Sequence, residues 1–459
     1  MKKQTLKPHM KRTLLATFGI LVFQLNAQQA SKMSLKEAVA YAEKNSPTLQ
    51  NAQTDVTIAE TTVKNIKSIG LPQVNASASF QQYLQIPGSW IKNFNPSPGS
   101  PEYIFLKFQQ QFYASGSIGV NQLLFDGSFF LGLKAAKEYV NMSQLLVAKS
   151  KADLQSNVAK AYLLALTTRK NIDLLESNLK TLEKSYKDVQ GLNKEGFAES
   201  LDVQRLELAV SNLNIQKEKL QNAASVTVNL LKFQIGMPMD STLILTDDLE
   251  TLDKSMSSAE TASNNFDIKN RNETKIFEQA FSLSKMDEKR YKLGYYPTLV
   301  GFLTHQVTTN RSQFNFFESN LTPNNNFVPA TLYGLSLNIP IFDGFRKQTQ
   351  MQDVRLKRMK TENEFRMFEN AANMEYTNAK LSYEINLKQV EAQKKNLDLA
   401  KDIYNKTNIK FREGVGSSLE IMQADTDLKT AQINYLNSLY DLVISKMDLK
   451  KAKGEEILN

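Results

Sequence analysis

An internal duplication is the feature that most constrains how this chain can fold. The segments KEGFAESLDV (residues 194–203) and REGVGSSLEI (residues 412–421) each place a Gly-containing break inside a long, charged, heptad-like pattern. Three pairs of landmarks are each separated by 218 residues: Gly196 and Gly414, Ser200 and Ser418, and Gly236 and Gly454. At the other end of the unit, LFDG (residues 124–127) recurs as IFDG (residues 341–344). The chain is therefore predicted to be a tandem repeat, with one helix–turn–helix in each half and the halves arranged around an axis.

Residues 1–27 have the form of a secretory signal. Five Lys and Arg side chains precede a short apolar run, residues 14–23, and the segment ends at Ala27. The run is too short to span a bilayer, so cleavage after Ala27 is expected. Without these five basic residues the formal charge falls from +9 to +4. The high pI therefore belongs largely to the targeting segment, and no nucleic-acid partner is predicted.

The residue types in the chain exclude cysteine chemistry and leave a single histidine for histidine chemistry. The chain has no cysteine, which excludes disulfides, thiolate catalysis and Cys-bound metals. His9 lies in the signal, so a Ser-His-Asp triad or a His-based metal site would depend on His305 alone. The preferred interpretation of His305 is a strand residue that faces water. We therefore expect no enzyme, no metal and no cofactor.

Two segments alternate between apolar and polar residues with the period of a β-strand. The apolar positions from Val74 to Phe80 alternate with Asn, Ser and Gln. This pattern predicts a hairpin over residues 73–124, with a long Pro-, Gly- and Asn-rich loop that contains Trp90. A second hairpin is predicted over residues 298–342. Each hairpin is either a half-buried sheet of a soluble domain or part of a transmembrane barrel with one face toward lipid, and alternation alone favours the soluble sheet.

Helical patterns on both sides of the hairpins define the predicted domain organisation. It consists of a first repeat (28–247), a linker or equatorial segment (248–268), a second repeat (269–454) and a tail (455–459). The first repeat has a helix from a capping box at Ser34 to about residue 69, with a bend near Pro47, then the hairpin, a long helix (128–193), a tip turn (194–199) and a return helix (200–235). The second repeat has a helix ending near residue 293, the hairpin, a long helix (346–411), a tip turn (412–417) and a return helix (418–453). A short strand is expected at residues 242–246.

The lengths of these helices indicate how they are arranged. At a rise of 1.5 Å per residue, each long helix extends about 100 Å, and the two shorter helices of the first half extend about 54 Å each. Two short helices placed end to end match one long helix, so each half supplies one continuous and one composite rod. Four strands are too few to close a membrane barrel, because bacterial barrels begin at eight. Closure would require several copies around a cyclic axis, and three copies would supply twelve strands.

The order and spacing of these features resemble the TolC-like family of outer-membrane efflux proteins. The resemblance covers nearly all of the mature chain and depends on the duplication, the two Phe-Asp-Gly junctions and the two Gly-containing turns. It implies an internally duplicated α+β membrane protein. Four transmembrane strands per chain would contribute to the 12-stranded β-barrel of a homotrimer, and the coiled-coil helices would form a periplasmic α-barrel. The resemblance further implies a passive exit duct in the outer membrane for a tripartite efflux pump or a type I secretion system. Its partners would be a periplasmic adaptor, an inner-membrane transporter and outer-membrane lipid.

The resemblance also assigns a gate at the helical tips. Acidic residues constrict the periplasmic entrance in the family; Glu420 and Asp202 match such positions, and Gln423 stands where the family has a further acid. Phe411 and Gly416 replace the locking Tyr and Arg of the family, so that polar lock is not reproduced. Three symmetry-related carboxylates would repel one another and attract cations. The alternative is that Glu420 and Asp202 only stabilise helix N-termini.

The two tip turns are the expected docking points for the adaptor. Their residues are Gly196, Phe197, Ala198, Glu199, Ser200 and Leu201 in the first turn, and Gly414, Val415, Gly416, Ser417, Ser418 and Leu419 in the second. Glycines there would permit a partner backbone to approach closely, or would merely reverse the chain. The competing interpretation of the whole chain is a periplasmic coiled-coil adaptor or tether, but that role leaves the two hairpins unexplained.

Overall fold

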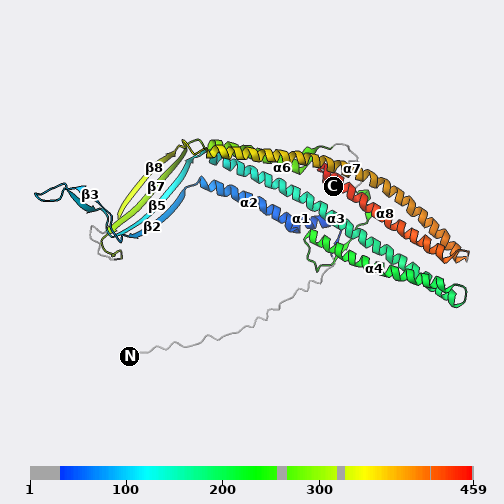
Figure 1. The fold of residues 1–459 in the computed structure, drawn as a ribbon. Coiled ribbons are helices and arrows are strands. Elements are labelled where there is room, and N and C mark those ends of the chain that lie inside the picture. Colours follow the sequence, from blue (N-terminus) through cyan, green and yellow to red (C-terminus); the bar gives the residue numbers. More distant parts are fainter. Residues whose placement is uncertain (1–30, 256–265, 318–325, 414, 457–459) are drawn as a thin grey trace, which may run out of the picture.

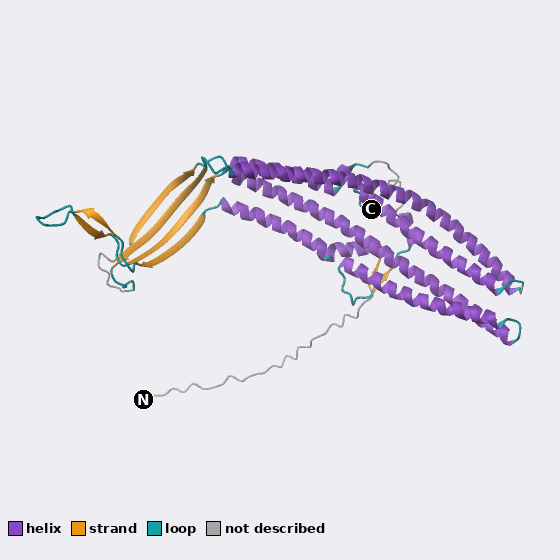
Figure 2. Ribbon diagram, in the orientation of Figure 1, coloured by secondary structure: helices purple, strands orange, loops and turns teal. Residues whose placement is uncertain are grey.

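The molecule is elongated, with a sheet at one end and long helices that run from it to two turns at the opposite end (Figure 1, Figure 2). This computed structural model describes residues 31–255, 266–317, 326–413 and 415–456. The expected signal (residues 1–27), Gly414 and the last three residues of the expected tail lie outside the described residues. The predicted fold class is confirmed: a duplicated α+β chain combines long coiled-coil helices with a four-stranded sheet.

Helices account for most of the described chain, and the strands form three sheets. The helices are α1 (Leu35–Asn45), α2 (Pro47–Ile69), α3 (Gly127–Lys194), α4 (Ser200–Ile235), α5 (Leu249–Ser255), α6 (Asn272–Leu293), α7 (Arg346–Arg412) and α8 (Ser418–Lys453), with a 3-10 helix at Ile268–Asn270. The strands are β1 (Ser31–Met33), β2 (Gln73–Gln82), β3 (Gly88–Lys92), β4 (Tyr103–Lys107), β5 (Phe112–Phe125), β6 (Leu243–Leu245), β7 (Thr298–Arg311) and β8 (Val328–Asn338). None of the helices within these described ranges has an apolar stretch long enough to cross a membrane.

The short helices join end to end, as their lengths suggested. α4 ends at Gly236, whose φ of 72° is left-handed, and a Cβ there would lie 2.6 Å from the carbonyl oxygen of Asn45. The carboxyl end of α4 therefore abuts the break between α1 and α2. In the second half, α8 ends at Gly454 with a φ of 77°, and a Cβ there would lie 3.1 Å from the backbone of Asn270, just before α6. Each half thus has one continuous rod, α3 or α7, and one composite rod.

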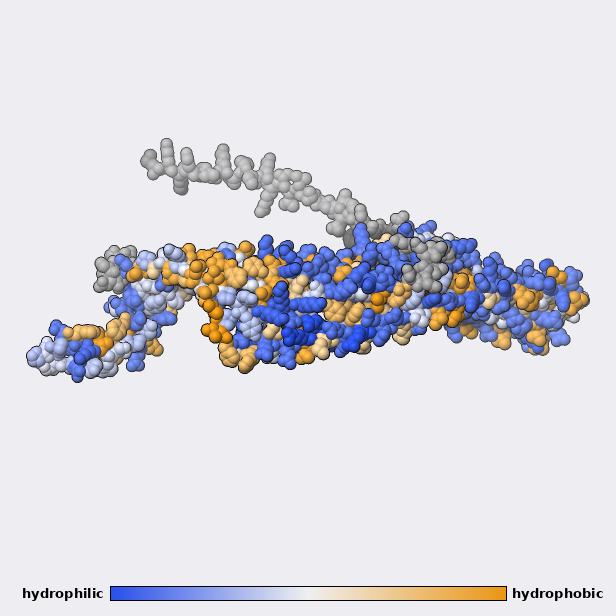
Figure 3. All heavy atoms as spheres, turned by 90° about the horizontal axis from the view of Figure 1, so that it is seen from above, coloured by the Kyte–Doolittle hydropathy of each residue, from blue (hydrophilic) through white to orange (hydrophobic). Residues whose placement is uncertain are grey.

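The sheet has four antiparallel strands in the order β2–β5–β7–β8. Residues in cross-strand register share a face. Val74, Val120, Leu303 and Tyr333 form one apolar row across all four strands. The opposite face is largely polar on β2 and β5, where the hydroxyls of serines 77 and 117 lie 2.8 Å apart. Figure 3 shows apolar side chains gathered toward the sheet end of the molecule, whereas the helices farther out are largely hydrophilic.

His305 lies on the apolar face of the sheet. It is a strand residue, as expected, but it is in register with Ile118 of β5 and Thr331 of β8. Its Nδ1 atom shares a hydrogen bond of 2.8 Å with the Thr331 hydroxyl. The side chain is exposed, as expected for a residue that faces water, and the register adds that it shares the apolar face of the sheet. The sequence could not assign the face, because alternation within β7 is weak and only the cross-strand register resolves it.

Several short elements differ from the sequence-based expectations. The first helix is two helices, because Pro47 has no amide hydrogen and begins α2 after the break at Ser46. The expected loop around Trp90 contains the β3–β4 hairpin. The strand expected at residues 242–246 is β6, and it pairs in parallel with β1, which was not predicted. The linker contains α5. Such short segments have too few residues for a periodic signal, so tertiary contacts decide their structure.

A cluster of charges joins α6 to α7. Glu288 of α6 is only 9% exposed and accepts hydrogen bonds of 2.9 Å from both Arg355 and Arg358 of α7. The Arg358 and Arg355 guanidinium groups lower the pKa of Glu288 from 4.5 to about 2. Because the folded state favours the carboxylate, this stabilisation is complete above the unfolded pKa and is lost as the pH falls toward 2.

We expect Glu288→Gln to be less stable than the parent chain at pH 7, because a neutral amide cannot pair with two guanidinium groups. Its thermal midpoint should also depend less steeply on pH between 4.5 and about 2. Circular dichroism melts at several pH values measure both effects. Glu364→Gln is the control, since Glu364 makes only an exposed ion pair of 3.8 Å with Lys360. A Glu288→Gln variant whose thermal midpoint falls with pH as steeply as that of the parent chain would contradict this role.

Gly236→Ala should destabilise the protein, because an alanine Cβ would collide with the backbone of Asn45. The left-handed conformation alone costs a non-glycine residue about 1–2 kcal/mol, and the collision adds to that cost. The thermal unfolding midpoint measures the effect. Gly196→Ala is the matched control, since its φ is 80° but no atom lies within 4 Å of an added Cβ. An equal fall of the unfolding midpoint in the two variants would show that the contact with Asn45 contributes nothing to stability.

Candidate functional site

The residues expected to form a gate and docking points lie at the end of the molecule farthest from the sheet (Figure 1). There α3 contacts both α4 and α8, and α7 contacts α8, so the helices form a layer in the order α4–α3–α8–α7. Two helical hairpins stand side by side in this layer, and each is closed by one of the two turns (Figure 2). α4 and α7 form the outer edges of the layer.

The first turn reverses the chain through a left-handed glycine. Gly196 has a φ of 80°, and the Phe197 amide donates a 2.8 Å hydrogen bond to the Leu192 carbonyl at the end of α3. The Asn193 side chain donates to the Ala198 carbonyl over 2.7 Å and thereby holds the turn together. An alanine here would meet no atom within 4 Å, so glycine is required by the backbone conformation and not by close packing.

The second turn uses glycine for a different reason. The amides of Val415 and Gly416 both donate to the Lys410 carbonyl, over 3.0 and 3.1 Å. A Cβ on Gly416 would lie 3.0 Å from the backbone nitrogen of Phe411, so the chain passes too close to the end of α7 for a larger residue. The two turns are therefore equivalent in position but not in geometry.

The expected gate residues lie on the first turns of the return helices. α8 begins at Ser418, and the Ser417 hydroxyl caps it by accepting a 3.2 Å hydrogen bond from the Glu420 amide. The Glu420 side chain is exposed. Gln423 lies about one turn further along and donates a 2.8 Å hydrogen bond to Asp427.

Asp202 occupies the corresponding place on α4. Glu199 is the N-cap residue of this helix and Ser200 is its first residue. The Asp202 carboxylate is 24% exposed and lies 3.7 Å from the Arg205 guanidinium. Both acids thus sit near a helix N-terminus, where the helix dipole favours negative charge. The geometry is compatible with the gate and with the simpler stabilising role.

An apolar cluster connects the two hairpins next to the turns. Leu182 and Val189 of α3 and Leu206 of α4 are buried there, and Phe411 of α7 and Met422 of α8 pack against them. Phe411 was expected only as the replacement for a locking Tyr, and Met422 was not predicted. Leu182 and Val189 were recognisable as seam positions because they are seven residues apart. Their partners on the other hairpin could not be recognised, because that contact joins residues more than 200 positions apart.

A half-buried ion pair lies beside this cluster. Asp425 and Lys429 of α8 are 16% and 13% exposed, and they line a groove of about 320 Å³ between α3, α4 and α8. Burial raises the pKa of Asp425, although the Lys429 ammonium partly opposes that shift. Burial and the Asp425 charge also raise the pKa of Tyr404 on α7. Asp425 and Lys429 belong to no motif in the sequence and were not predicted as site residues.

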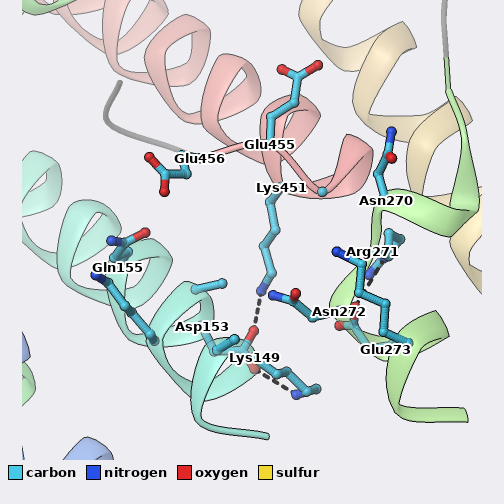
Figure 4. A pocket seen from close by; sticks show the side chains of 15 residues that line it. Lys149, Asp153, Gln155, Asn270, Arg271, Asn272, Glu273, Lys451, Glu455 and Glu456 are labelled. Carbon is cyan, nitrogen blue, oxygen red and sulfur yellow. Dashed lines mark hydrogen bonds and ion pairs between the residues drawn. The ribbon is translucent and has the colours of Figure 1, made fainter. Parts of the chain in front are cut away.

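A second pocket lies midway along the molecule, between α3, the start of α6 and the end of α8 (Figure 4). Asp153 bridges Lys149 (2.7 Å) and Lys451 (2.8 Å), and Arg271 pairs with Glu375 over 2.6 Å. Burial would raise the pKa of Asp153, but hydrogen bonds from the two lysines outweigh it and leave the pKa lowered. These charges are paired within the chain and fasten the end of α8 to its neighbours. No group of three or more His, Asp or Glu side chains in the described parts of the chain comes together to hold a metal.

The profile of the outer membrane efflux protein family matches residues 38–236 and 295–455, which include both hairpins' tips and most of the sheet. The chain belongs to this family. The family is one of outer membrane efflux proteins, which places this protein in the outer membrane.

Individual relatives are distant in sequence but share the fold. The probable efflux pump outer membrane protein TtgC of Pseudomonas putida is 22% identical over 304 residues, which cover 66% of this chain and 60% of TtgC. The chain thus spans about 60% of the length of this relative. The outer membrane protein VceC from Vibrio cholerae superposes with a TM-score of 0.66 at 14% identity, over 92% of this chain and 96% of VceC. The CmeC outer membrane channel of Campylobacter jejuni gives 0.69 at 14% identity, over 93% of this chain and 86% of CmeC.

Proposed function

We propose that three copies of this chain form a passive exit duct of a tripartite efflux pump or a type I secretion system. The observation that carries the proposal is that the molecule has two open edges. They run its whole length and are built from different elements. Near the sheet the helices follow the order α2–α3–α6–α7, and near the tips α4–α3–α8–α7. One edge therefore consists of β2, α2 and α4, and the other of β8 and α7. β2 follows α2 in the chain and β8 precedes α7, so each edge continues from sheet to helices.

The strand edges cannot remain open in lipid. β2 has 10 residues and β8 has 11, which is enough for each to span the hydrocarbon layer. An unpaired edge there would leave backbone N–H and C=O groups unsatisfied at several kcal/mol each. Four strands cannot close on themselves. Pairing of β2 in one copy with β8 in the next satisfies both edges, and three copies make twelve strands.

Both helix edges carry exposed apolar side chains near the tips. On α4, Leu201, Leu208 and Ile215 are 48%, 63% and 51% exposed, and they advance in steps of seven, as in a coiled-coil seam. On α7, at the same height, Leu399, Ile403 and Ile409 are 59%, 45% and 61% exposed. Because the two edges differ, copies would join head to tail, and such contacts generate a ring when the rotation closes.

The apolar face of the sheet supports contact with outer-membrane lipid, and the tips support docking of an adaptor. Phe197, Leu201, Val415 and Leu419 are 81%, 48%, 77% and 59% exposed at the two turns. A group of apolar side chains at one end of a protein marks an interaction surface. In this proposal a periplasmic adaptor binds there, and an inner-membrane transporter supplies the energy and most of the selectivity for cargo.

Crosslinking across the strand edges tests the duct directly. The chain has no cysteine, so an Ala76→Cys change on β2 can be combined in turn with Tyr333→Cys, Leu335→Cys and Leu337→Cys on β8. We expect at least one pair to give a covalent ladder that ends at three copies, from outer-membrane fractions and without boiling in sodium dodecyl sulfate. The single-cysteine variants are the controls. A soluble periplasmic monomer that never crosslinks would instead support the tether.

For the gate, we infer that the apolar cluster holds the two hairpins together while acids at the tips select ions. Phe411 and Met422 pack against Leu182, Val189 and Leu206, and this contact takes the place of the polar lock that the chain lacks. Three copies of Glu420 around a narrow axis would repel one another and attract cations. Asp202 and Gln423 complete the ring of polar side chains in this proposal.

We expect Glu420→Ala to weaken block of the open channel by multivalent cations about tenfold, equal to about 1.4 kcal/mol, because it removes three carboxylates from the constriction. Bilayer recordings measure the block and the conductance. Glu391→Ala is the control, since Glu391 is an exposed acid in the middle of α7.

Met422→Ser is the complementary variant, because it loosens the apolar contact without changing any charge. It should raise the conductance and leave cation block in place. Unchanged block in the Glu420 variant would remove that residue from the gate, and unchanged conductance in the Met422 variant would remove the cluster.

A further inference from the structure

The β3–β4 hairpin is a separate structure beyond the end of the sheet (Figure 1). The ladder between β2 and β5 ends at Gln82 and Phe112, and one more hydrogen bond follows, from the Tyr83 amide to the Gln111 carbonyl over 2.8 Å. The chain then forms a two-stranded sheet in which β3 pairs only with β4. A lone hairpin of two short strands is marginally stable in water. Something must therefore cover this hairpin if it keeps its shape.

Both faces of the hairpin carry apolar side chains. Trp90 is in register with Phe105, and their ring centroids lie 5.4 Å apart. Phe105 also fills the space above Gly88, where a Cβ would lie 2.5 Å from the ring. The next pair in register, Ile91 and Ile104, points to the other face.

Large apolar side chains of the hairpin and its flanking segments are strongly exposed in the single chain. The exposed fractions are 95% for Leu84, 70% for Trp90, 85% for Phe94 and 68% for Phe108. An exposed apolar surface of this kind marks a contact with another molecule.

Lipid does not fit this surface. β2 already has the 10 residues that a strand needs to cross the hydrocarbon layer, and the hairpin begins after β2 ends. The hairpin also carries two lysines. Lys92 ends β3 opposite Tyr103, and Lys107 ends β4 opposite Gly88. It therefore lies outside the hydrocarbon, where an apolar surface is covered by protein.

A second copy of the chain is the protein that the structure brings next to this surface. The hairpin is a direct continuation of β2, and β2 is the open edge of the sheet. In the ring proposed above, β8 of the next copy pairs with that edge, so the hairpin is continuous with the interface between copies. We propose that each β3–β4 hairpin packs against the neighbouring copy and clasps the copies together at the outer mouth of the duct. This inference rests on the proposed ring.

Trp90 is the only tryptophan of the chain, so its fluorescence reports on this contact without labelling. The measurement compares the intact trimer in detergent with the chain dissociated by heat in sodium dodecyl sulfate. We expect a blue-shifted emission and several-fold weaker quenching by acrylamide in the trimer. The control is a Trp90→Phe, Phe197→Trp variant, whose probe lies on an exposed tip turn and should be quenched in both states.

The outcomes separate this inference from the proposed function. A trimer in which acrylamide quenches Trp90 as strongly as in the dissociated chain would overturn the clasp and leave the duct intact. Strong quenching by a brominated detergent would identify an apolar solvent as the cover and would also overturn the clasp. Failure to find any trimer on the gel would count against the duct itself. As a second measurement, Trp90→Ser should lower the temperature at which the trimer dissociates, and Phe197→Ser should not.

Discussion

An unpaired backbone N–H or C=O group inside a bilayer costs several kcal/mol, and β2 and β8 each present a row of such groups along one side. In the proposed duct these edges pair between copies, because four strands are too few to close a barrel by themselves. The same constraint would account for the exposed apolar residues on both outer helices as well as on the sheet.

The junctions between the sheet and the helices, and between successive helices, link the position of the strands to that of the tips. At the end of β5, the Asp126 carboxylate accepts hydrogen bonds from the amides of Ser128 and Phe129 and starts α3 without a connecting loop. Midway along the molecule, Gly236 and Gly454 let the return helices abut the helices that lead back to the sheet. Each composite rod therefore runs from the sheet to the tips without a gap, and the position of the tips depends on the position of the strands.

The tips would differ from the pattern that the resemblance implies in how contact between the two helical hairpins is made. A polar lock needs donors and acceptors in fixed places, and the chain has Phe411 and Gly416 at those positions. The structure has an apolar cluster next to the turns instead, to which Phe411 and Met422 contribute. Apolar contacts are non-directional, so in the proposed gate this cluster would hold the helical hairpins together without donors and acceptors in fixed places. The half-buried Asp425–Lys429 pair lies beside it, and either charge would be costly to leave there without its partner.

The sequence by itself determined the duplication, the two long helices, the composite rods and the two hairpins of the sheet, because these follow from local periodicity, chain length and matched landmarks. It also located the turns that contain Gly196 and Gly416. Only the tertiary structure decided that His305 lies on the apolar face, that β1 pairs with β6 and that Trp90 belongs to a separate hairpin, β3–β4. It likewise decided that Met422 of one helical hairpin packs against the cluster that contains Leu182 and Val189 of the other. These features depend on cross-strand register and on contacts between distant segments, and neither leaves a periodic signal along one strand or helix.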